Sequence, residues 1–176
     1  NIVPMAKGFG MVVLAYDPYV PVEVFEKLGV EKVEENYLIE NADFISIHAV
    51  FTPDSKNMFN AARFKRMKKT AYLINCARGE FVDEVALYDA VRKGEIAGAA
   101  LDVLKKEQVR MDNPLLELES VTITPHAAYY SMTSREKYMR RPYEEISRVT
   151  RSVWPRYLIN TAVKEAYVAK WGPMRD

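Results

Sequence analysis

Cysteine and histidine are scarce in this sequence, which contains one cysteine, Cys76, and two histidines, His48 and His126. A single cysteine excludes an internal disulfide framework and a zinc site of clustered thiolates, and we expect no metal site. The longest apolar runs, such as MVVLAY at 11–16, are far shorter than the ~20 residues that cross a bilayer. A signal-peptide pattern is also missing at the N-terminus, so we expect a cytoplasmic protein.

A large excess of charge is missing too, because the formal net charge is only +1. Such a balance gives no general attraction to nucleic acid or membrane. The densest basic run is ARFKRMKK at 62–69, where Phe64 and Met67 have the i, i+3 spacing of a buried helix face. We interpret the run as a solvated helix face rather than a nucleic-acid patch, and expect neither nucleic acid nor membrane as a partner. The expected solvent-facing cations are Arg63, Lys65, Arg66 and Lys69.

Short apolar runs rich in branched and aromatic residues alternate with segments of helical periodicity. The runs predict strands, and they lie at 11–16, 44–47, 71–77, 97–101 and 121–124. The segments between them predict helices at 21–28, 36–41, 57–68 and 83–93. Regular alternation of the two kinds favours parallel pairing. We therefore predict an α/β fold with a doubly wound parallel sheet.

The segment 83–93 carries the clearest helix signals in the sequence. Asp83 stands where an N-cap belongs, and Gly94 stands where a helix commonly ends. The expected buried stripe consists of Val85, Ala86, Leu87, Ala90 and Val91.

After about residue 131 the sequence predicts one long, charged helix. Thr133 and Glu136 fit a capping box at its start, and Pro142 should kink or split it near Arg141. The tail from Trp154 onward has aromatic residues without regular spacing. It is typical of a strap that lies on another surface.

Each predicted strand is followed by a residue capable of ionic chemistry. These residues are Asp17, His48, Arg78, Asp102 and His126. In an open parallel sheet, ligands bind beyond the carboxyl ends of the strands. One polar residue at a strand end is ordinary, but five indicate a site at one edge of the sheet.

Three of these residues suit the reduction of a 2-oxo acid. His126 can donate a proton to a ketone oxygen as hydride arrives, with a nearby carboxylate holding the ring. Arg78 offers a planar fork for the substrate carboxylate. Asp17, after an early strand, can accept hydrogen bonds from a ribose and repel a 2′-phosphate, which favours NAD over NADP.

Four segments together resemble the nucleotide-binding domain of the D-2-hydroxyacid dehydrogenases, which has a Rossmann-like fold: 6–19, 74–87, 94–107 and 113–131. The resemblance implies Arg78, Glu107 and His126 as catalytic residues, NAD as cofactor, a small 2-hydroxy or 2-oxo acid as substrate, and a homodimer. It implies an NAD-binding domain at 1–130, and a helix and tail at 131–176 that return to a substrate domain. The implied cofactor contacts are Asp17, Pro18, His48, Thr52, Cys76, Ala77, Arg78, Asp102 and His126, and the implied pocket residue is Tyr129.

Some of these assignments have alternatives. His48 could instead anchor its loop, Cys76 is more simply strand packing than a nucleophile, and Tyr129 could be an ordinary surface or core tyrosine. The whole protein could also be an NAD(H)-sensing scaffold, like the C-terminal-binding corepressors that share this fold.

The sequence also departs from the family pattern. Gln108 stands where the family usually has proline. The family's first strand and glycine turn are not found, and residues 1–7 are short for its first helix. We therefore expect the natural polypeptide to carry a further N-terminal substrate domain and that strand.

Overall fold

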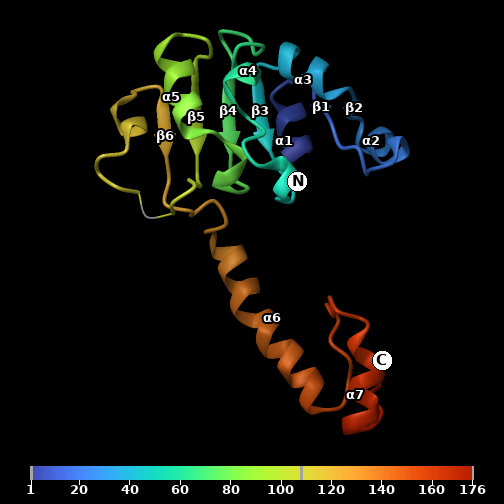
Figure 1. The fold of residues 1–176 in the computed structure, drawn as a ribbon. Coiled ribbons are helices and arrows are strands. Elements are labelled where there is room, and N and C mark those ends of the chain that lie inside the picture. Colours follow the sequence, from blue (N-terminus) through green and yellow to red (C-terminus); the bar gives the residue numbers. More distant parts are fainter. Residues whose placement is uncertain (1, 108, 176) are drawn as a thin grey trace. The chain divides into compact units, whose positions relative to one another are not determined.

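A computed structural model describes residues 2–107 and 109–175 of the chain. Its Cα positions group into two compact units, Asn1–Ala128 and Tyr129–Asp176. The assignment of residues 1–130 to an NAD-binding domain and of residues 131–176 to a returning helix and tail stays a prediction. Figure 1 shows the elements of the first unit, which are α1 (Ile2–Gly8), β1 (Leu14–Ala15), α2 (Val22–Leu28), β2 (Glu31–Lys32), α3 (Glu35–Asn41), β3 (Phe44–Ile47), η1 (Pro53–Ser55), α4 (Ala61–Phe64), β4 (Tyr72–Asn75), η2 (Gly79–Phe81), α5 (Glu84–Arg92), β5 (Gly98–Leu101), η3 (Pro114–Glu117) and β6 (Val121–Ile123).

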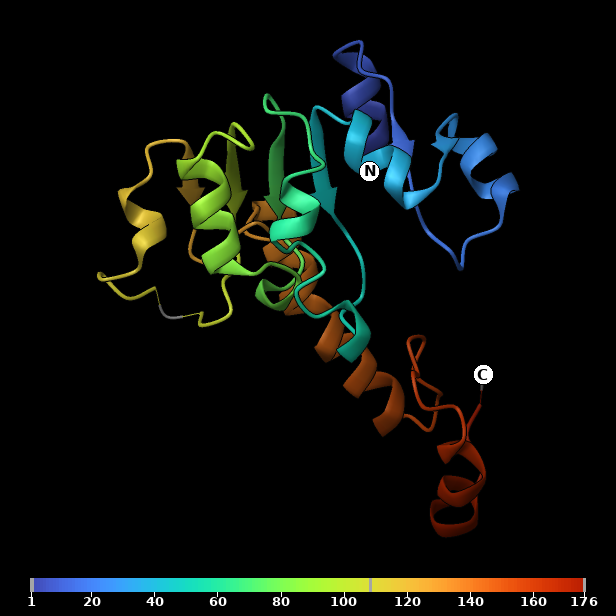
Figure 2. The same ribbon diagram turned by 45° about the horizontal axis from the view of Figure 1, so that its top comes forward.

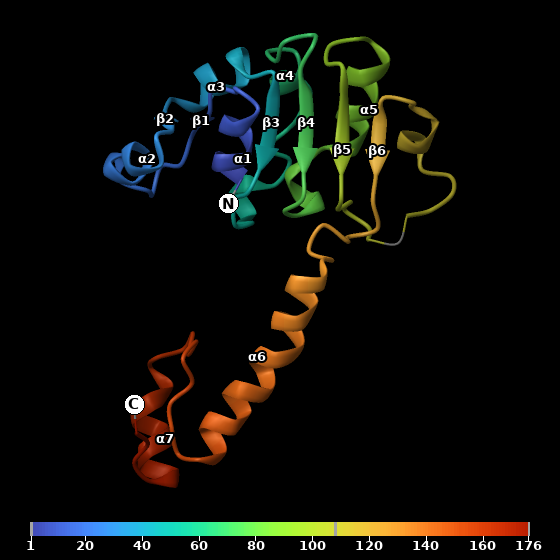
Figure 3. The same ribbon diagram turned by 180° about the vertical axis from the view of Figure 1, so that it is seen from behind.

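Four strands form one parallel sheet in the order β3-β4-β5-β6, and Figure 3 shows them running in the same direction. This confirms the predicted α/β fold with a parallel sheet. The remaining predicted strand, at 11–16, is the first along the chain, and it is reduced to β1. It pairs in parallel with β2, which was not predicted, in a separate two-stranded sheet. No strand among the described residues pairs with the edge of β3 opposite to β4.

The core lies on one face of the four-stranded sheet. Residues 45, 47, 73, 75, 99 and 101 alternate along three strands and are all buried, as the period of two requires. Helix α5 lies against the sheet in Figures 1 and 2, whereas β4 to β6 have no helix in front of them in the opposite view of Figure 3. From α5, Leu87 is fully buried in this core. On the other face Phe44 and Tyr72 stack with ring centroids 5.8 Å apart, and 54% of Phe44 is exposed.

Helix α5 matches its prediction closely, except for one side chain. The Asp83 carboxylate accepts hydrogen bonds from the backbone of Val85 and Ala86, and Gly94 has the positive φ of a helix-ending glycine. Val85, however, is 75% exposed, so its predicted burial is wrong. It lies one residue away from the stripe formed by Ala86, Leu87 and Ala90.

The helix predicted at 57–68 is shorter, because α4 begins only after its cap at Asn60. Before the cap, Asn57 lies in a turn with φ of +53°, and Phe59 forms a parallel bridge with Val82. Phe64 and Met67 are buried, as predicted. Three cations of the basic run pair with acids in or just after α3. These ion pairs are Arg63–Glu35 at 2.8 Å, Arg66–Glu40 at 2.9 Å and Lys68–Asp43 at 2.8 Å.

The second unit contains α6 (Met132–Thr150) and α7 (Val163–Trp171). Helix α6 runs through Pro142 without a break, so the predicted split is wrong. Its N-cap is Ser131, whose hydroxyl accepts the Ser134 amide, and not Thr133. The tail is not wholly irregular, because α7 forms within it and Trp154 packs on Tyr167 with ring centroids 5.6 Å apart. Among the described residues, no helix combines the length and apolar character needed to span a membrane.

Candidate active site

Four of the five predicted strand-end residues follow strands of the same sheet. His48, Arg78, Asp102 and His126 come after β3, β4, β5 and β6 respectively, and these strands are all parallel. Their carboxyl ends therefore lie along one edge. Asp17 follows β1 in the two-stranded sheet, so the prediction of a single sheet edge does not hold for it.

His126 is hydrogen bonded to Glu107, with 3.0 Å between the ring Nδ1 and the carboxylate Oε1. Both side chains are open to solvent, with exposed fractions of 39% for His126 and 67% for Glu107. The bond to Nδ1 leaves the opposite ring nitrogen, Nε2, for another partner. The His126 backbone has φ of +51°, a left-handed conformation that a non-glycine residue adopts only at a cost.

Asp102 holds the loop that carries His126. Its carboxylate accepts hydrogen bonds from the amides of Ala127 (2.8 Å) and Ala128 (2.9 Å) and from the hydroxyl of Thr124. The side chain is buried, and desolvation by burial raises its pKa, but these hydrogen bonds and the nearby His126 outweigh it, so the pKa lies below its ordinary value. An ionised carboxylate thus fixes the turn after β6.

Asn75 fixes the turn that carries Arg78. This fully buried side chain donates to the Arg78 carbonyl (2.8 Å) and accepts from the Ala77 amide (3.0 Å). Its backbone carbonyl accepts the Asp102 amide (2.9 Å), which ties the ends of β4 and β5 together. The Arg78 guanidinium is exposed and donates to the Ala77 carbonyl at 2.7 Å.

The residues predicted to contact NAD lie in loops after β1, β3 and β4, with the exception of Asp102 and His126. The Asp17 carboxylate accepts the Tyr19 amide through Oδ1 at 2.8 Å. Among the described residues its Oδ2 has no hydrogen-bond donor, so it suits a ribose hydroxyl. Thr52 opens η1 in a mutual capping arrangement with Ser55, and His48 Nε2 lies 2.9 Å from the Ser46 hydroxyl. This set of hydroxyl, carboxylate and cationic groups is chemically compatible with NAD.

Several predicted residues have less defined surroundings. Pro18 is exposed and Ala77 is half-buried. Cys76 is exposed just beyond β4, so its interpretation as strand packing is wrong. Partial desolvation of the sulfur by the surrounding protein and the neighbouring Asp102 raise the pKa of the Cys76 thiol, which disfavours a reactive thiolate. Tyr129 belongs to the second unit, where it is 55% exposed. Gln108 lies outside the described residues, within which no group of three metal-ligating side chains is found.

Sequence reasoning missed two residues that support the site, Asn75 and Thr124. The available signal was the amide of Asn75 at the end of the apolar strand YLIN, where a buried polar side chain must find hydrogen-bond partners. Thr124 gave no comparable signal, because hydroxyls are common at strand ends.

Two sequence relatives cover most of the chain. A D-3-phosphoglycerate dehydrogenase of Methanocaldococcus jannaschii is 41% identical over 161 residues, covering 91% of this chain and 30% of that protein. A glyoxylate reductase of Korarchaeum cryptofilum is 43% identical over 159 residues, covering 90% of this chain and 48% of that protein. The chain therefore spans less than half the length of these relatives.

Solved structures show the same similarity. The D-isomer specific 2-hydroxyacid dehydrogenase from Lactobacillus delbrueckii ssp. bulgaricus, solved as an NAD-complexed form, gives a TM-score of 0.83 at 34% identity, over 90% of this chain and 52% of that one. A D-lactate dehydrogenase from Aquifex aeolicus, complexed with NAD and lactic acid, gives 0.76 at 33% identity, over 85% of this chain and 48% of that one. Residues 1–128 match the family model described as D-isomer specific 2-hydroxyacid dehydrogenase, NAD binding domain. The chain belongs to this family of NAD-binding domains.

Proposed function

We propose that this chain is the nucleotide-binding part of an NAD-dependent 2-hydroxyacid dehydrogenase that, in the reductive direction, acts on a small 2-oxo acid. The observation that carries the proposal is the His126–Glu107 hydrogen bond of 3.0 Å, at the same sheet edge as Arg78. An imidazole backed by a carboxylate is suited to general acid–base catalysis. The family and its named relatives support the same reaction class.

Each side chain has a distinct task in this mechanism. The exposed Arg78 guanidinium holds the substrate carboxylate and so orients the ketone. Protonated His126, with Nδ1 bonded to Glu107 Oε1, donates from Nε2 to the ketone oxygen. Glu107 stabilises the charged imidazolium and fixes the ring orientation. NAD, when bound in its reduced form, supplies the hydride.

Cofactor recognition belongs to a second group of residues. Asp17 accepts hydrogen bonds from the adenosine ribose, and its charge disfavours the 2′-phosphate of NADP. Pro18, His48, Thr52, Cys76 and Ala77 line the cofactor side, together with Arg78, Asp102 and His126, while Tyr129 contributes to the substrate pocket. Two structural neighbours, both solved as complexes with NAD, support NAD as the cofactor.

The proposal is tested by measuring NADH oxidation by the full-length protein with glyoxylate, hydroxypyruvate, pyruvate and bulkier 2-oxo acids. We expect turnover with at least one of them and a strong preference for NADH over NADPH. Absence of turnover with every 2-oxo acid contradicts the proposal. If partner proteins then bind in an NADH-dependent way, the scaffold function is favoured instead.

A cytoplasmic homodimer is also part of the proposal. The homodimer is supported by a stripe of exposed apolar side chains on one face of α6, at the spacing of successive helical turns. The stripe consists of Met132, Met139, Tyr143 and Ile146. Sedimentation equilibrium of the full-length protein tests it, and a monomer at all concentrations contradicts it.

A further inference from the structure

We propose that Glu84 is a positioning residue, which holds the loop after β5 so that Glu107 stays within hydrogen-bond distance of His126. This inference rests on the proposed function, because it gives Glu84 a task in the acid–base chemistry of His126. Glu84 is the first residue of α5, and among the described residues it forms no hydrogen bond or ion pair with either partner of the pair. It acts on them through the backbone of Lys105.

The link is one hydrogen bond between segments far apart in the sequence. The Glu84 Oε1 accepts the backbone amide of Lys105 at 2.6 Å. The backbone of Glu84 is held in place, because Asp83 caps the helix immediately before it and Ala86 and Leu87, two and three residues after it, are buried. The loop is therefore tied to a rigid helix two residues before Glu107.

The same part of the loop is held from a second side by Gly79. A Cβ atom at Gly79 would overlap the carbonyl group of Leu104 and the amide nitrogen of Lys105. The turn that follows Arg78 and the loop that precedes Glu107 are thus in direct backbone contact. Leu104 is buried, so the exposed part of the loop begins at Lys105.

The anchor matters because the ion pair cannot hold the loop by itself. Glu107 is 67% exposed, and a solvent-exposed ion pair contributes little to stability. Among the described residues, His126 is the one hydrogen-bond partner of the Glu107 carboxylate. The position of Glu107 must therefore come from its backbone. Going along the loop toward Glu107, the nearest side chain that holds this backbone is Glu84, at Lys105.

The charges beside the His126 ring determine which way the pH profile should move. Glu107 and the ionised Asp102 face it, and both favour the protonated ring. Releasing Glu107 removes one of these two charges, while Asp102 remains held by its own hydrogen bonds. Reduction requires the protonated ring, so the loss should be greatest at the alkaline side of the profile.

The test compares three substitutions of Glu84 in the full-length protein. Glu84→Asp keeps the charge at the start of α5 but is one methylene too short to reach the Lys105 amide. Glu84→Ala removes both the charge and the hydrogen bond to Lys105. In Glu84→Asp and Glu84→Ala, we expect kcat for reduction to fall about tenfold at alkaline pH and little at acidic pH. That loss is smaller than the ~10²- to 10⁴-fold that removal of the acid itself would cost. Glu84→Gln, which keeps an acceptor oxygen, should restore most of the activity.

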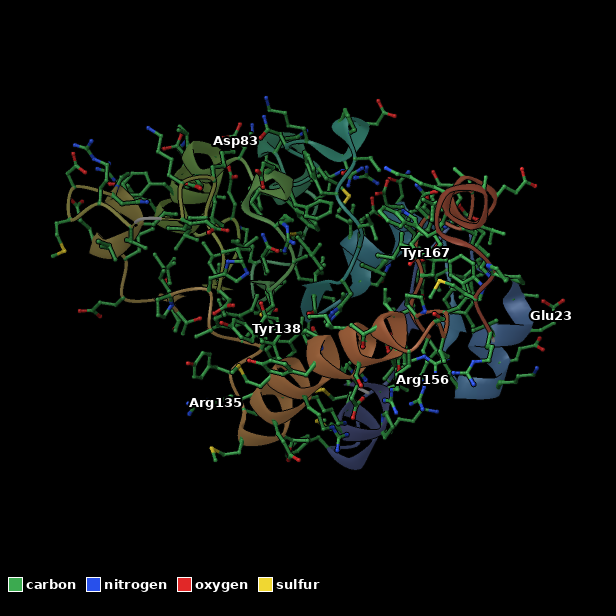
Figure 4. All side chains as sticks on the ribbon, turned by 90° about the horizontal axis from the view of Figure 1, so that it is seen from below. Glu23, Asp83, Arg135, Tyr138, Arg156 and Tyr167 are labelled. Atoms are coloured by element: carbon green, nitrogen blue, oxygen red, sulfur yellow. The ribbon has the colours of Figure 1, made fainter. Side chains whose placement is uncertain are left out.

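A matched control separates positioning from stability. Asp83, labelled in Figure 4, immediately precedes Glu84 in the sequence, and the hydrogen bonds of its carboxylate are those that cap α5, from the amides of Val85 and Ala86. Asp83→Ala should lower the melting temperature and leave the pH profile unchanged. If it shifts the profile as Glu84→Asp does, the effect is one of helix stability and the inference is wrong.

A second readout does not depend on turnover. The His126 ring is followed by NMR through a pH titration, with its signal assigned from His126→Gln and with His48 as the internal reference. Glu84→Asp should move the His126 midpoint to lower pH and leave that of His48 in place. An unchanged His126 midpoint overturns the inference even where 2-oxo acids are reduced. If no 2-oxo acid is reduced, the proposed function fails, while this titration still tests Glu84.

Discussion

His126 combines a left-handed backbone, a hydrogen bond to Glu107 and a neighbouring buried acid. These features support a ring that gains and loses a proton in a fixed place. We predict that His126→Gln lowers kcat by ~10²- to 10⁴-fold, the usual contribution of general acid–base catalysis. NADH affinity, measured by fluorescence titration, should be nearly unchanged because the nucleotide is held mainly by other residues. An unchanged kcat would remove His126 from the mechanism.

Asp17 tests the cofactor assignment independently of the chemistry. In Asp17→Ala the ribose loses a charge-assisted hydrogen bond and the 2′-phosphate of NADP is no longer repelled. We predict a roughly 10- to 100-fold loss of NAD affinity, together with a weaker preference for NAD over NADP. If the ratio of NAD affinity to NADP affinity is the same in the variant and the wild type, this role of Asp17 is contradicted.

Asp102 is predicted to contribute to stability in a pH-dependent way. Asp102→Asn replaces one acceptor oxygen by a donor, and the unsatisfied amide or hydroxyl should cost about 1–3 kcal/mol in the free energy of unfolding. The wild-type pKa is lowered on folding, so this stabilisation is complete above the ordinary carboxyl pKa of about 3.9 and is lost as pH falls through the lower folded-state value.

Urea unfolding of the Asp102→Asn variant and the wild type at several pH values measures this difference. The gap between the two proteins should be full near neutral pH and should narrow below about pH 4. A gap that is independent of pH would show that the carboxylate charge has no part in it.

At this scale, the sequence predicted the reacting side chains better than their supports. His126 and Arg78 could be found because ionisable residues directly follow apolar strands. Asn75 offered a signal as a polar residue at the end of an apolar strand, but Thr124 and Glu84 could not be found, because each one bonds to a residue far away in the sequence, Asp102 and Lys105 respectively. Their partners are determined by how the loops after β4, β5 and β6 meet, and no local pattern contains that information.

Among the elements, helix α6 contains a residue that destabilises a helix, Pro142. Pro142 has no amide to donate to the carbonyl of Tyr138, whose side chain projects from α6 in Figure 4. A proline inside a helix costs about 3 kcal/mol or more. We predict that Pro142→Ala slows hydrogen exchange of the α6 amides in the full-length protein, whereas Lys137→Ala, on an exposed position of the same helix, has little effect. Equal exchange rates in all three proteins would contradict it.

Elements with local signals were predicted well. Helix α5 has its cap, its stripe and its terminal glycine within one continuous segment. Helix α4 was predicted too long because Phe59 pairs with Val82, a contact that the periodicity of 57–68 cannot show. The strand at 11–16 shortened to β1 for a similar reason, since strand length depends on partners and here β2 is the one paired with it.

For the whole molecule, the edge of β3 that no strand of the described residues covers predicts self-association of the 176-residue chain expressed alone. An unpaired strand edge beside exposed aromatic side chains is a template for pairing with another chain. We predict that Phe44→Lys, on this strand, reduces the associated fraction measured by size-exclusion chromatography with light scattering. Tyr19→Lys, at a 93% exposed loop position, is the control and should change it little. If both variants associate as the wild type does, the β3 edge is not the cause.

The order of the main sheet has a further consequence for how the chain is made. Because β3, β4, β5 and β6 are neighbours both in sequence and in space, each strand that leaves the ribosome after β3 finds a partner already synthesised. After β3, which waits for β4, no strand of this sheet has to wait for a later one before it can pair, and the loops to be closed are short in sequence. The sheet can therefore grow strand by strand during translation, and the edge that carries Arg78, Asp102 and His126 is completed only when β6 emerges.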